Sequence, residues 1–292
     1  MLGKVSYLKS YRINDVKVTE SNDGTKCVIL NQNNLENCFK LINDHEIMEL
    51  KINDKFNKYK DLSFLSECPN IEAIYIDNHF IEDLSKLYSL KNLKKLGTGE
   101  AKVKLELENL WTLEKLYITW HNKISGLSKL LNLKQLSIWD YAPKTRDLEE
   151  ISNLFRLETL IITQSRIKTL KGISNLKQLK NLQLYYLRTL TDISDIDEVN
   201  NLGKLELENC KNIEDFSVIK NLNNLYQLDL FKCGDMENIN FIKNLSNLRN
   251  LAFYGTKVND GDLSLCMNVK NVHFDNKKHY SHKSNEFNNY FD

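Results

Sequence analysis

The chain has few of the residues that interrupt regular structure, with 2 prolines and 10 glycines in 292 residues. Long irregular loops are therefore not expected. It also lacks any run of about 18 apolar residues, the length that a membrane-spanning helix needs. Residues 1–18 contain no apolar stretch of the kind found in secretory signals. We therefore expect a cytoplasmic protein that has no membrane partner.

An excess of charge of one sign is missing too. Lysine and arginine together number 40 and aspartate and glutamate 39, which leaves a formal net charge of +1. Proteins that bind nucleic acids show a basic excess or a basic stripe, because they must neutralise phosphates. The sequence has neither feature, and we expect no nucleic-acid partner.

Motifs of catalysis and metal binding are absent as well. The sequence contains no G-x-x-x-x-G-K, G-x-S-x-G or H-E-x-x-H. The cysteines form no C-x-x-C pair, which argues against a zinc site or a disulfide framework, and reduced thiols fit the cytoplasm. Glu206 and Glu208 share one strand face and could support acid–base chemistry, but a charged binding face is the preferred interpretation. We expect no catalytic residue, no metal ligand and no cofactor, and therefore not an enzyme.

What the sequence does contain is a repeat of the form L-x-x-L-x-L, spaced by 20 to 24 residues. The clearest copies begin at Leu113, Leu133, Leu157, Leu179, Leu202, Leu225 and Leu248, and weaker copies begin at Ile47, Ile71, Leu93 and Val269. A fixed period of this length is typical of a leucine-rich repeat solenoid. Such proteins usually act through the surface that they display, so binding is the default function.

The pattern within one repeat predicts where each side chain points. Positions are numbered from the first leucine, so that positions 1, 4 and 6 are apolar. Because side chains alternate along a strand, positions 4 and 6 should point inward, and positions 3, 5 and 7 outward on a concave side. The second half of a repeat, such as Ile167, Leu170 and Ile173, has near-helical spacing. We predict an α/β solenoid with a parallel concave sheet and short helical or 3₁₀ convex segments.

Position 9 of the repeat is expected to hold a small or hydrogen-bonding residue beneath the turn that follows the strand. Cys210 and Cys233 occupy this position in neighbouring repeats, one period of 23 residues apart. We expect them to be structural thiols. His79 and His121 also fall at position 9, and we expect both to be buried and hydrogen-bonded to the backbone.

The chain divides into three parts. In residues 1–46, β-like alternation around two turn signals is followed by helical spacing over residues 33–43. We expect this part to be an amino-terminal cap, formed by a hairpin and one helix, because the ends of a solenoid must be shielded. Residues 47–276 hold about eleven repeats. Residues 277–292 form a carboxyl-terminal tail that should lie against the last repeat or extend from it.

Large aromatic side chains recur at outward positions 5, 7 and 8, mixed with charged groups. Aromatics of this kind are uncommon on a solvated face without a reason, and tryptophan and tyrosine are frequent binding hot spots. The alternative is that some of them pack sideways and shield the sheet. We predict a partner-binding face made of Tyr117, Trp120, Trp139, Asp140, Tyr185, Tyr186, Glu206, Glu208, Asp229, Phe231, Lys232 and Tyr254.

The segments NLKQLKNLQL and NLNNLYQLDL, each followed by a short I/L-x-x-I segment and N-L, resemble bacterial internalin-type leucine-rich repeats. The resemblance covers residues 47–276. Stand-alone chains of this kind that end in a segment like NKKHYSH look like leucine-rich repeat proteins of bacterial toxin–immunity loci. The resemblance implies a bacterial immunity protein, a toxin inhibitor that holds a toxin domain in its concave face.

Together these observations favour a non-enzymatic protein-binding module that uses its concave face and is a monomer when free. One alternative is an intracellular scaffold or sensor that binds through its convex face or its cap. A surface adhesin, which the internalin resemblance would imply, is less favoured because no secretion signal or wall-anchoring region is recognised in the sequence.

Overall fold

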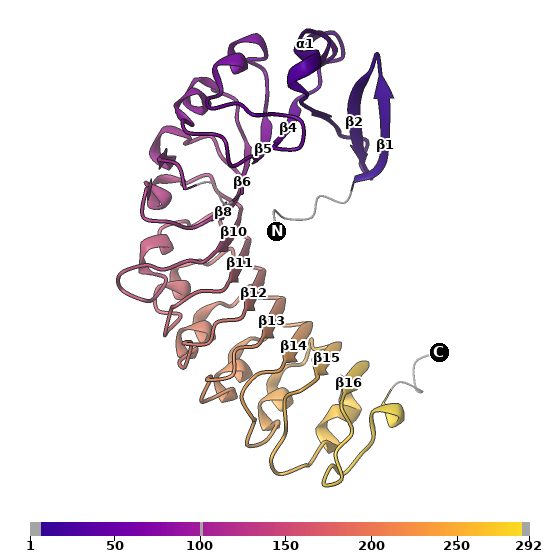
Figure 1. Cartoon of the computed structure of the whole chain (residues 1–292). Helices are drawn as coiled ribbons and strands as arrows, with labels where there is room; N and C mark the ends of the chain where they lie inside the picture. Colours follow the sequence, from indigo (N-terminus) through magenta and orange to yellow (C-terminus); the bar gives the residue numbers. More distant parts are fainter. Residues whose placement is uncertain (1–6, 100–101, 288–292) are drawn as a thin grey trace. The chain divides into compact units, whose positions relative to one another are not determined.

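The computed structural model describes residues 7–99 and 102–287 and separates into two compact units, Met1–Ile138 and Trp139–Asp292. Both units are built from the same coil, in which a short strand is followed by a turn and a 3₁₀ segment (Figure 1). The predicted leucine-rich repeat fold, with parallel strands and short 3₁₀ segments, is confirmed. In the described residues, no helix combines the length and the apolar character needed to cross a membrane.

Unit 1 contains one larger sheet and one small one. The larger sheet has the order β1-β2-β3-β4-β5-β6-β8, antiparallel between β1 and β3 and parallel from β3 onward. Its strands are β1 (Tyr7–Ile13), β2 (Val16–Ser21), β3 (Lys26–Ile29), β4 (Glu49–Asn53), β5 (Ala73–Asp77), β6 (Lys95–Thr98) and β8 (Lys115–Thr119). The small sheet pairs β7 (Leu105–Glu106) with β9 (Ile124–Ser125). The 3₁₀ segments are η1 (Gln32–Asn34), η2 (Ser63–Glu67), η3 (Ser85–Ser89), η4 (Leu107–Asn109) and η5 (Leu127–Lys129).

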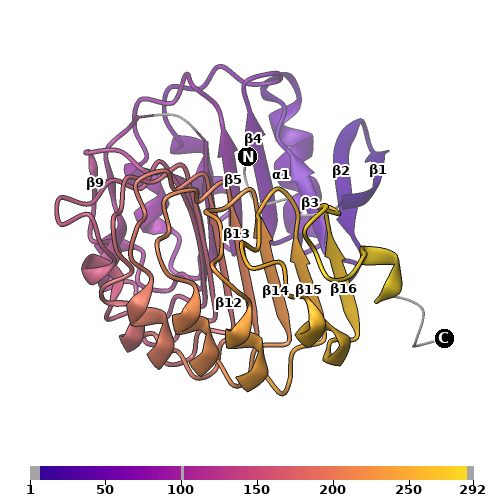
Figure 2. The same ribbon diagram turned by 90° about the horizontal axis from the view of Figure 1, so that it is seen from below.

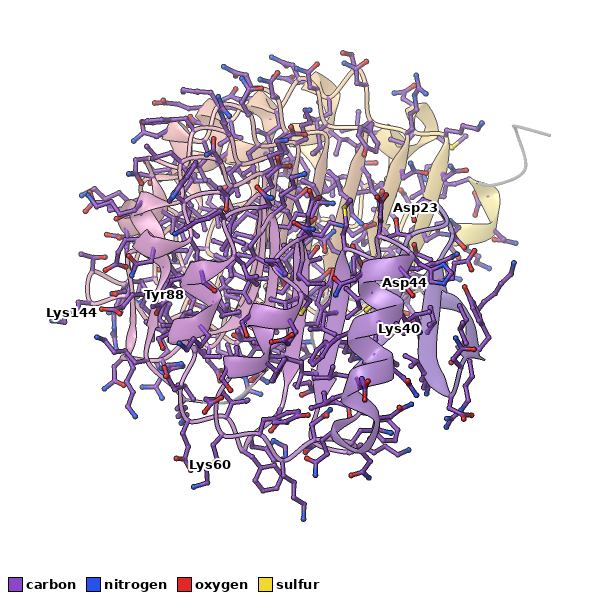
Figure 3. The ribbon with its side chains drawn as sticks, turned by 90° about the horizontal axis from the view of Figure 1, so that it is seen from above. Asp23, Lys40, Asp44, Lys60, Tyr88 and Lys144 are labelled. Atoms are coloured by element: carbon purple, nitrogen blue, oxygen red, sulfur yellow. The ribbon has the colours of Figure 1, made fainter. Side chains whose placement is uncertain are left out.

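The amino-terminal part of unit 1 differs from a repeat. Asn14 and Asp15, with φ of 47° and 63°, make the tight turn between β1 and β2. Helix α1 (Leu35–Asp44) buries an apolar side and leaves Lys40 and Asp44 exposed (Figure 3). Strand β3 goes beyond the predicted hairpin, because it joins β2 to the first repeat strand β4. Residues 1–6 of the expected cap lie outside the described residues, and its capping role stays a prediction.

Unit 2 is a run of parallel strands in one register (Figure 2). They are β11 (Thr159–Thr163), β12 (Asn181–Tyr185), β13 (Lys204–Glu208), β14 (Gln227–Phe231), β15 (Asn250–Phe253) and β16 (Asn271–Phe274), while β10 (Gln135–Trp139) ends at the first residue of the unit. The 3₁₀ segments are η6 (Glu149–Ile151), η7 (Ile173–Asn175), η8 (Ser194–Glu198), η9 (Ser217–Asn221), η10 (Asn240–Asn244), η11 (Ser264–Asn268) and η12 (Ser284–Glu286). In both units, each predicted repeat start is followed two residues later by a strand.

The core of unit 2 lies between its strands and its 3₁₀ segments. Pairing aligns equivalent residues of successive repeats, so that Leu182 faces Leu205 and Leu205 faces Leu228. All three leucines are fully buried. Ile196 and Ile219, which come from the 3₁₀ segments, are fully buried as well. Each coil thus buries its aliphatic groups against its neighbours, which no single repeat could do alone.

Two recurrent polar side chains fix the loops of unit 2. An aspartate or asparagine accepts a hydrogen bond from the backbone N–H two residues later and so opens several of the 3₁₀ segments, as at Asp192, Asp215, Asn238 and Asp262. An asparagine just before the first repeat leucine donates to a backbone carbonyl of the preceding repeat. These contacts are Asn201 to Lys177 O (2.7 Å), Asn224 to Asn200 O (2.7 Å) and Asn247 to Asn223 O (2.8 Å). They connect neighbouring coils outside the strands.

The described part of the tail, residues 277–287, lies against the last coils of unit 2. The Val258 N–H donates to Tyr280 Oη at 3.0 Å. The ring of Phe287 is almost completely buried and meets Phe274 edge-on at 5.7 Å. The last apolar surface of the unit is therefore covered by residues of the same chain. Residues 288–292 of the expected tail lie outside the described residues.

We predict that Leu205→Ala and Leu228→Ala each lower the free energy of unfolding by about 2–5 kcal/mol, because each removes a fully buried side chain from a packed core. Chemical denaturation of the full chain measures the change. The exposed Glu214 is the control, and Glu214→Ala should stay within about 0.5 kcal/mol of the parent chain. A loss below about 1 kcal/mol for both leucine variants would contradict the assigned register.

Candidate functional site

The outward side chains of unit 2 form rows across its strands. Strand register places Tyr185, Glu208 and Phe231, all at position 7, on successive strands β12, β13 and β14. Position 5 forms a second row, in which Gln183, Glu206, Asp229 and Ala252 lie in register. Neighbouring strands are about 4.8 Å apart, and the two rows about 7 Å apart. We call the six residues Tyr185, Glu206, Glu208, Asp229, Phe231 and Tyr254 the open-face cluster.

Two of the predicted residues, Tyr117 and Trp120, lie in unit 1. Tyr117 is buried, and its ring centroid lies 6.5 Å from that of Tyr75. Strand pairing places Gly97 between the two tyrosines, and its missing side chain lets their rings meet across β6. The expectation that Tyr117 is an exposed aromatic is therefore wrong, and its ring packs sideways over the sheet. Trp120 is half-buried.

The aromatic residues of unit 2 remain accessible to different degrees. Tyr186 and Tyr254 are 41% and 44% exposed, whereas Trp139, Tyr185 and Phe231 are half-buried. Phe231 and Tyr254 stack with centroids 6.2 Å apart and ring planes at 26°. The stacked pair therefore forms one preorganised aromatic surface.

Trp139 is oriented by a polar contact. Its indole Nε1 donates to Gln164 Oε1 at 2.9 Å. Asp140, the next residue, is exposed. At the first coil of unit 2, Trp139 is thus half-buried and Asp140 exposed, and their part in binding stays a prediction.

Three carboxylates lie in the middle of the open-face cluster. Glu206 pairs with Lys204, Oε2 to Nζ at 2.9 Å. Asp229 is 8% exposed and accepts a hydrogen bond from Gln227 Nε2 at 2.6 Å. Glu208 Oε1 accepts from Tyr186 Oη at 3.3 Å and from Asn209 Nδ2 at 3.1 Å. Only the first of these carboxylates is neutralised by a cation among the described residues.

The negative charges of these carboxylates affect the pKa values of neighbouring acidic groups. Burial raises the pKa of Asp229, and the hydrogen bond from Gln227 opposes that rise in part. The negative charge of Glu206 raises the pKa further, against smaller opposing effects of Lys204 and His273. Burial also raises the pKa of Tyr185, and the neighbouring carboxylates, led by Glu206, add to that rise. The site therefore disfavours further negative charge.

Position 8, which follows the strand, has a left-handed backbone in six successive repeats of unit 2. The residues are Asp140 (φ 56°), Gln164 (56°), Tyr186 (61°), Asn209 (55°), Lys232 (51°) and Gly255 (66°). From Asp140 to Lys232, the N–H at this position donates to the position 7 carbonyl of the next repeat at 2.8–2.9 Å. The left-handed backbone is strained for bulky residues such as Tyr186. Sequence reasoning missed this conformation, although recurrent Asp, Asn and Gly at position 8 signal it.

Position 9 is buried in six successive repeats of unit 2, from Tyr141 to Thr256, as the thiols Cys210 and Cys233 illustrate. Their Sγ atoms donate to the carbonyls of Leu184 at 3.5 Å and Leu207 at 3.3 Å. Burial raises the pKa of Cys210 to about 11 and that of Cys233 to about 12. Both thiols stay protonated near neutral pH, which fits the predicted structural role and gives them little reactivity.

The two histidines at position 9 of unit 1 behave differently. His121 is half-buried, its Nδ1 accepts the Lys123 N–H at 3.3 Å, and burial lowers its pKa. The expectation for His79 is wrong, because its ring is exposed and pairs with Asp54. Asn78 is buried in its place and donates to Asn57 O at 3.0 Å.

Metal sites and cavities are the other features of the two units that could support chemistry. Among the described residues, no three histidine, cysteine, aspartate or glutamate side chains are grouped closely enough to hold a metal ion. A cavity of about 890 Å³ lies in unit 1 and is lined by His79, Glu82, Lys102, Lys104, Lys123 and neighbouring residues. None of the predicted site residues lines this cavity.

Comparison with known proteins supports the fold. Residues 151–259, a little over a third of the chain, match six copies of the BspA type leucine rich repeat region. An internalin from Listeria monocytogenes is 22% identical, with a TM-score of 0.58 over 82% of this chain and 66% of the internalin chain. The functional domain of InlJ from the same organism, which includes a cysteine ladder, is 15% identical, with a TM-score of 0.52 over 75% of this chain and 52% of that one. Among curated proteins, none matches significantly.

We predict that Asp229→Asn stabilises the chain at neutral pH. The folded pKa of Asp229 is raised above its usual 3.8, so the ionised carboxylate opposes folding at pH 7. This penalty fades as the pH falls through the raised folded pKa and is absent below about 3.8. The gain measured by urea unfolding should therefore shrink from pH 7 towards pH 4.

Asp262→Asn is the control of opposite sign for this prediction. The N–H of Ser264 lowers the pKa of Asp262, so its carboxylate contributes stability at neutral pH that is lost as the pH falls. Asp262→Asn should weaken the fold at pH 7 and lose its effect in acid. If Asp229→Asn instead destabilised the chain at pH 7, the carboxylate would be a structural element.

We also predict that Tyr186→Asn leaves stability unchanged or raises it by up to about 1 kcal/mol, because asparagine tolerates the left-handed backbone better than tyrosine does. Thermal unfolding measures the effect. Tyr185→Asn, at a half-buried position with an extended backbone, should lower stability by about 1 kcal/mol, because asparagine is disfavoured in strands. A loss above about 1 kcal/mol for Tyr186→Asn would show that its ring supports the fold.

Proposed function

We propose that the chain is a non-enzymatic protein-binding module. Its binding face is the outward side of the unit 2 strands, which carries the open-face cluster and is called the open face below. The observation that carries the proposal is the open-face cluster, where accessible aromatics surround carboxylates on a rigid sheet. Aromatic anchors on a preorganised surface are the usual source of binding energy between proteins. Trp139, Asp140, Tyr186 and Lys232 extend this face at its edge. Trp120 belongs to unit 1 and is kept as a separate candidate.

The proposal places the chain in the cytoplasm as a monomer when free, with no nucleic acid, membrane or cofactor as partner. Its near-neutral net charge supports the exclusion of nucleic acid. The cysteines at 27, 38, 68, 210, 233 and 266 are all free thiols and buried, which agrees with a reducing compartment.

A narrower proposal concerns the identity of the partner. We propose that it is a bacterial toxin domain and that the chain is its immunity protein. The support is the resemblance of the repeats to those of leucine-rich repeat proteins in toxin–immunity loci. Expression of the captured partner alone should then arrest growth, and co-expression of this chain should restore it. A partner that is harmless alone would rule out the immunity role and leave the binding role intact.

The alternative binding surface lies in unit 1 and has one observation in its favour. Trp111 and Leu131 occupy the same position of consecutive repeats and are 60% and 54% exposed. The Asn132 side chain donates to Trp111 O at 3.1 Å, which connects the two coils there. Such a pair of exposed apolar side chains suits a scaffold or sensor that binds away from the open face.

A photo-crosslinking amino acid placed at Tyr186, Tyr254 or Trp111 separates the two surfaces. We expect one discrete protein to be captured in the producing cells from Tyr186 and Tyr254 but not from Trp111. An additional control is Phe155, which is 59% exposed and precedes β11. Capture from Trp111 alone would favour the scaffold alternative and contradict the main proposal.

With the captured partner purified, Trp139→Ala and Tyr186→Ala should each weaken binding by about 2 kcal/mol, which is roughly 30-fold in Kd. The reason is that each variant removes an accessible aromatic anchor from the face. Isothermal titration calorimetry gives the affinity, and circular dichroism shows whether the variants remain folded. Unchanged affinity in both folded variants would place the partner elsewhere.

A further inference from the structure

The open-face cluster places negative charge between aromatic rings. Glu208 on β13 lies in register with Tyr185 on β12 and with Phe231 on β14. Glu206 and Asp229 lie in register with each other in the next row of the same face. The strands that carry these residues, β12 to β15, run side by side (Figure 2). Three carboxylates and an aromatic pair therefore share a small area of one rigid surface.

The part of the chain that the structure describes neutralises this charge only in part. Among the described residues, Lys204 is the one cation within ion-pair distance of the three carboxylates, and it pairs with Glu206. Glu208 and Asp229 accept hydrogen bonds from neutral groups only. Asp229 is 8% exposed, and burial of a carboxylate without a cation is unfavourable. The cluster thus retains charge that a cation from outside could compensate.

The other charged groups near Asp229 offset its charge only in part, because Lys204 and His273 each lower its pKa by less than burial raises it. Lys232 is exposed at position 8, and its stem lies so close to Gly255 that a Cβ there would approach Lys232 Cγ to 2.8 Å. His273 lies two strands from Asp229 in the same row, with Ala252 between them. The small Ala252 side chain adds neither charge nor a hydrogen-bond donor beside Asp229.

The shape of the cluster favours a planar cation. Phe231 and Tyr254 stack at 6.2 Å and offer an aromatic surface next to Glu208 and Asp229. A guanidinium group stacks on aromatic rings and donates two parallel hydrogen bonds to a carboxylate. An ammonium group is a compact point charge that cannot combine the two contacts in this way. Arginine therefore fits the cluster better than lysine does.

We infer that the open-face cluster accepts the guanidinium group of an arginine carried by a basic segment of a protein partner. In this arrangement the group stacks against Phe231 and Tyr254 and donates to Glu208 and Asp229. The inference rests on the proposed function and deepens it, because it assigns the chemistry that a partner must present. It also gives a reason for a nearly buried carboxylate at Asp229, where no cation of the described residues lies within ion-pair distance.

Three fluorescein-labelled peptides test the inference with the full chain at low salt. They share the sequence Gly-Ser-Gly-X-Ser-X-Gly-Ser-Gly, where X is arginine, lysine or citrulline, the uncharged analogue of arginine. Fluorescence anisotropy gives each Kd. The arginine peptide should bind about tenfold or more tightly than the citrulline peptide, because loss of the charge removes charge-assisted hydrogen bonds. The lysine peptide should bind more weakly than the arginine peptide.

Four variants locate the binding. Glu208→Gln and Asp229→Asn should each raise the Kd of the arginine peptide about tenfold, since each removes one acceptor charge. Glu214→Gln removes the same charge from an exposed loop position and should have little effect. Phe231→Leu should reduce the difference in affinity between the arginine and lysine peptides. Because Asp229→Asn is expected to stabilise the fold, its loss of binding cannot be attributed to unfolding.

The inference is overturned if the arginine and citrulline peptides bind equally well, or if none of the three peptides binds. It is also overturned if the Glu214→Gln, Glu208→Gln and Asp229→Asn variants bind the arginine peptide with equal affinity. These results are distinguishable from a failure of the proposed function. If the peptides fail while Tyr186 and Tyr254 still crosslink a partner, the binding role stands and the assigned chemistry is wrong. If the arginine peptide binds as expected while capture occurs from Trp111 alone, the proposed binding face fails.

Discussion

The close spacing of neighbouring coils is the constraint on which the rest of the structure depends. Parallel strands about 4.8 Å apart bring every side chain next to its counterpart in the adjacent repeats. Inside, this spacing admits aliphatic side chains that interlock, as Leu182, Leu205 and Leu228 do. Outside the strands, the asparagines that donate to the preceding coil and the left-handed residues at position 8 extend the same contact. Any residue that disturbs the spacing in one coil disturbs both neighbours.

The same constraint leaves the outward positions free for other uses. Positions 5, 7 and 8 contribute little to the interior, so their side chains can be chosen for what they display. Asp229 and Tyr186 illustrate the point from two directions. Burial without a cation makes the Asp229 carboxylate unfavourable at neutral pH, and Tyr186 occupies a backbone conformation that suits asparagine or glycine better. Residues that do not help folding and yet lie on an accessible face are those expected to serve binding.

The sequence was sufficient to predict the solenoid, because the leucine period determines which residues are buried and the strand follows each repeat start by two residues. The burial of Tyr117 could not be predicted, since it depends on Tyr75 two repeats away and on Gly97 between them. The exposure of His79 was missed because the adjacent Asn78 takes the buried place. For the open-face cluster, the sequence predicts which residues point outward. The absence of a cation at Asp229 among the described residues depends on how Lys204 and Gln227 are oriented, which the sequence does not show.

The central claim is that inward and outward positions of the same strands have separate tasks. It is tested most directly by measuring the free energy of unfolding for alanine substitutions at each position of β12, β13 and β14. The account predicts losses of about 2–5 kcal/mol at the inward leucines and changes within about 1 kcal/mol at most positions of the outward rows. Comparable losses at the outward and inward positions would contradict it, because the outward residues would then be part of the fold and not a surface available to a partner.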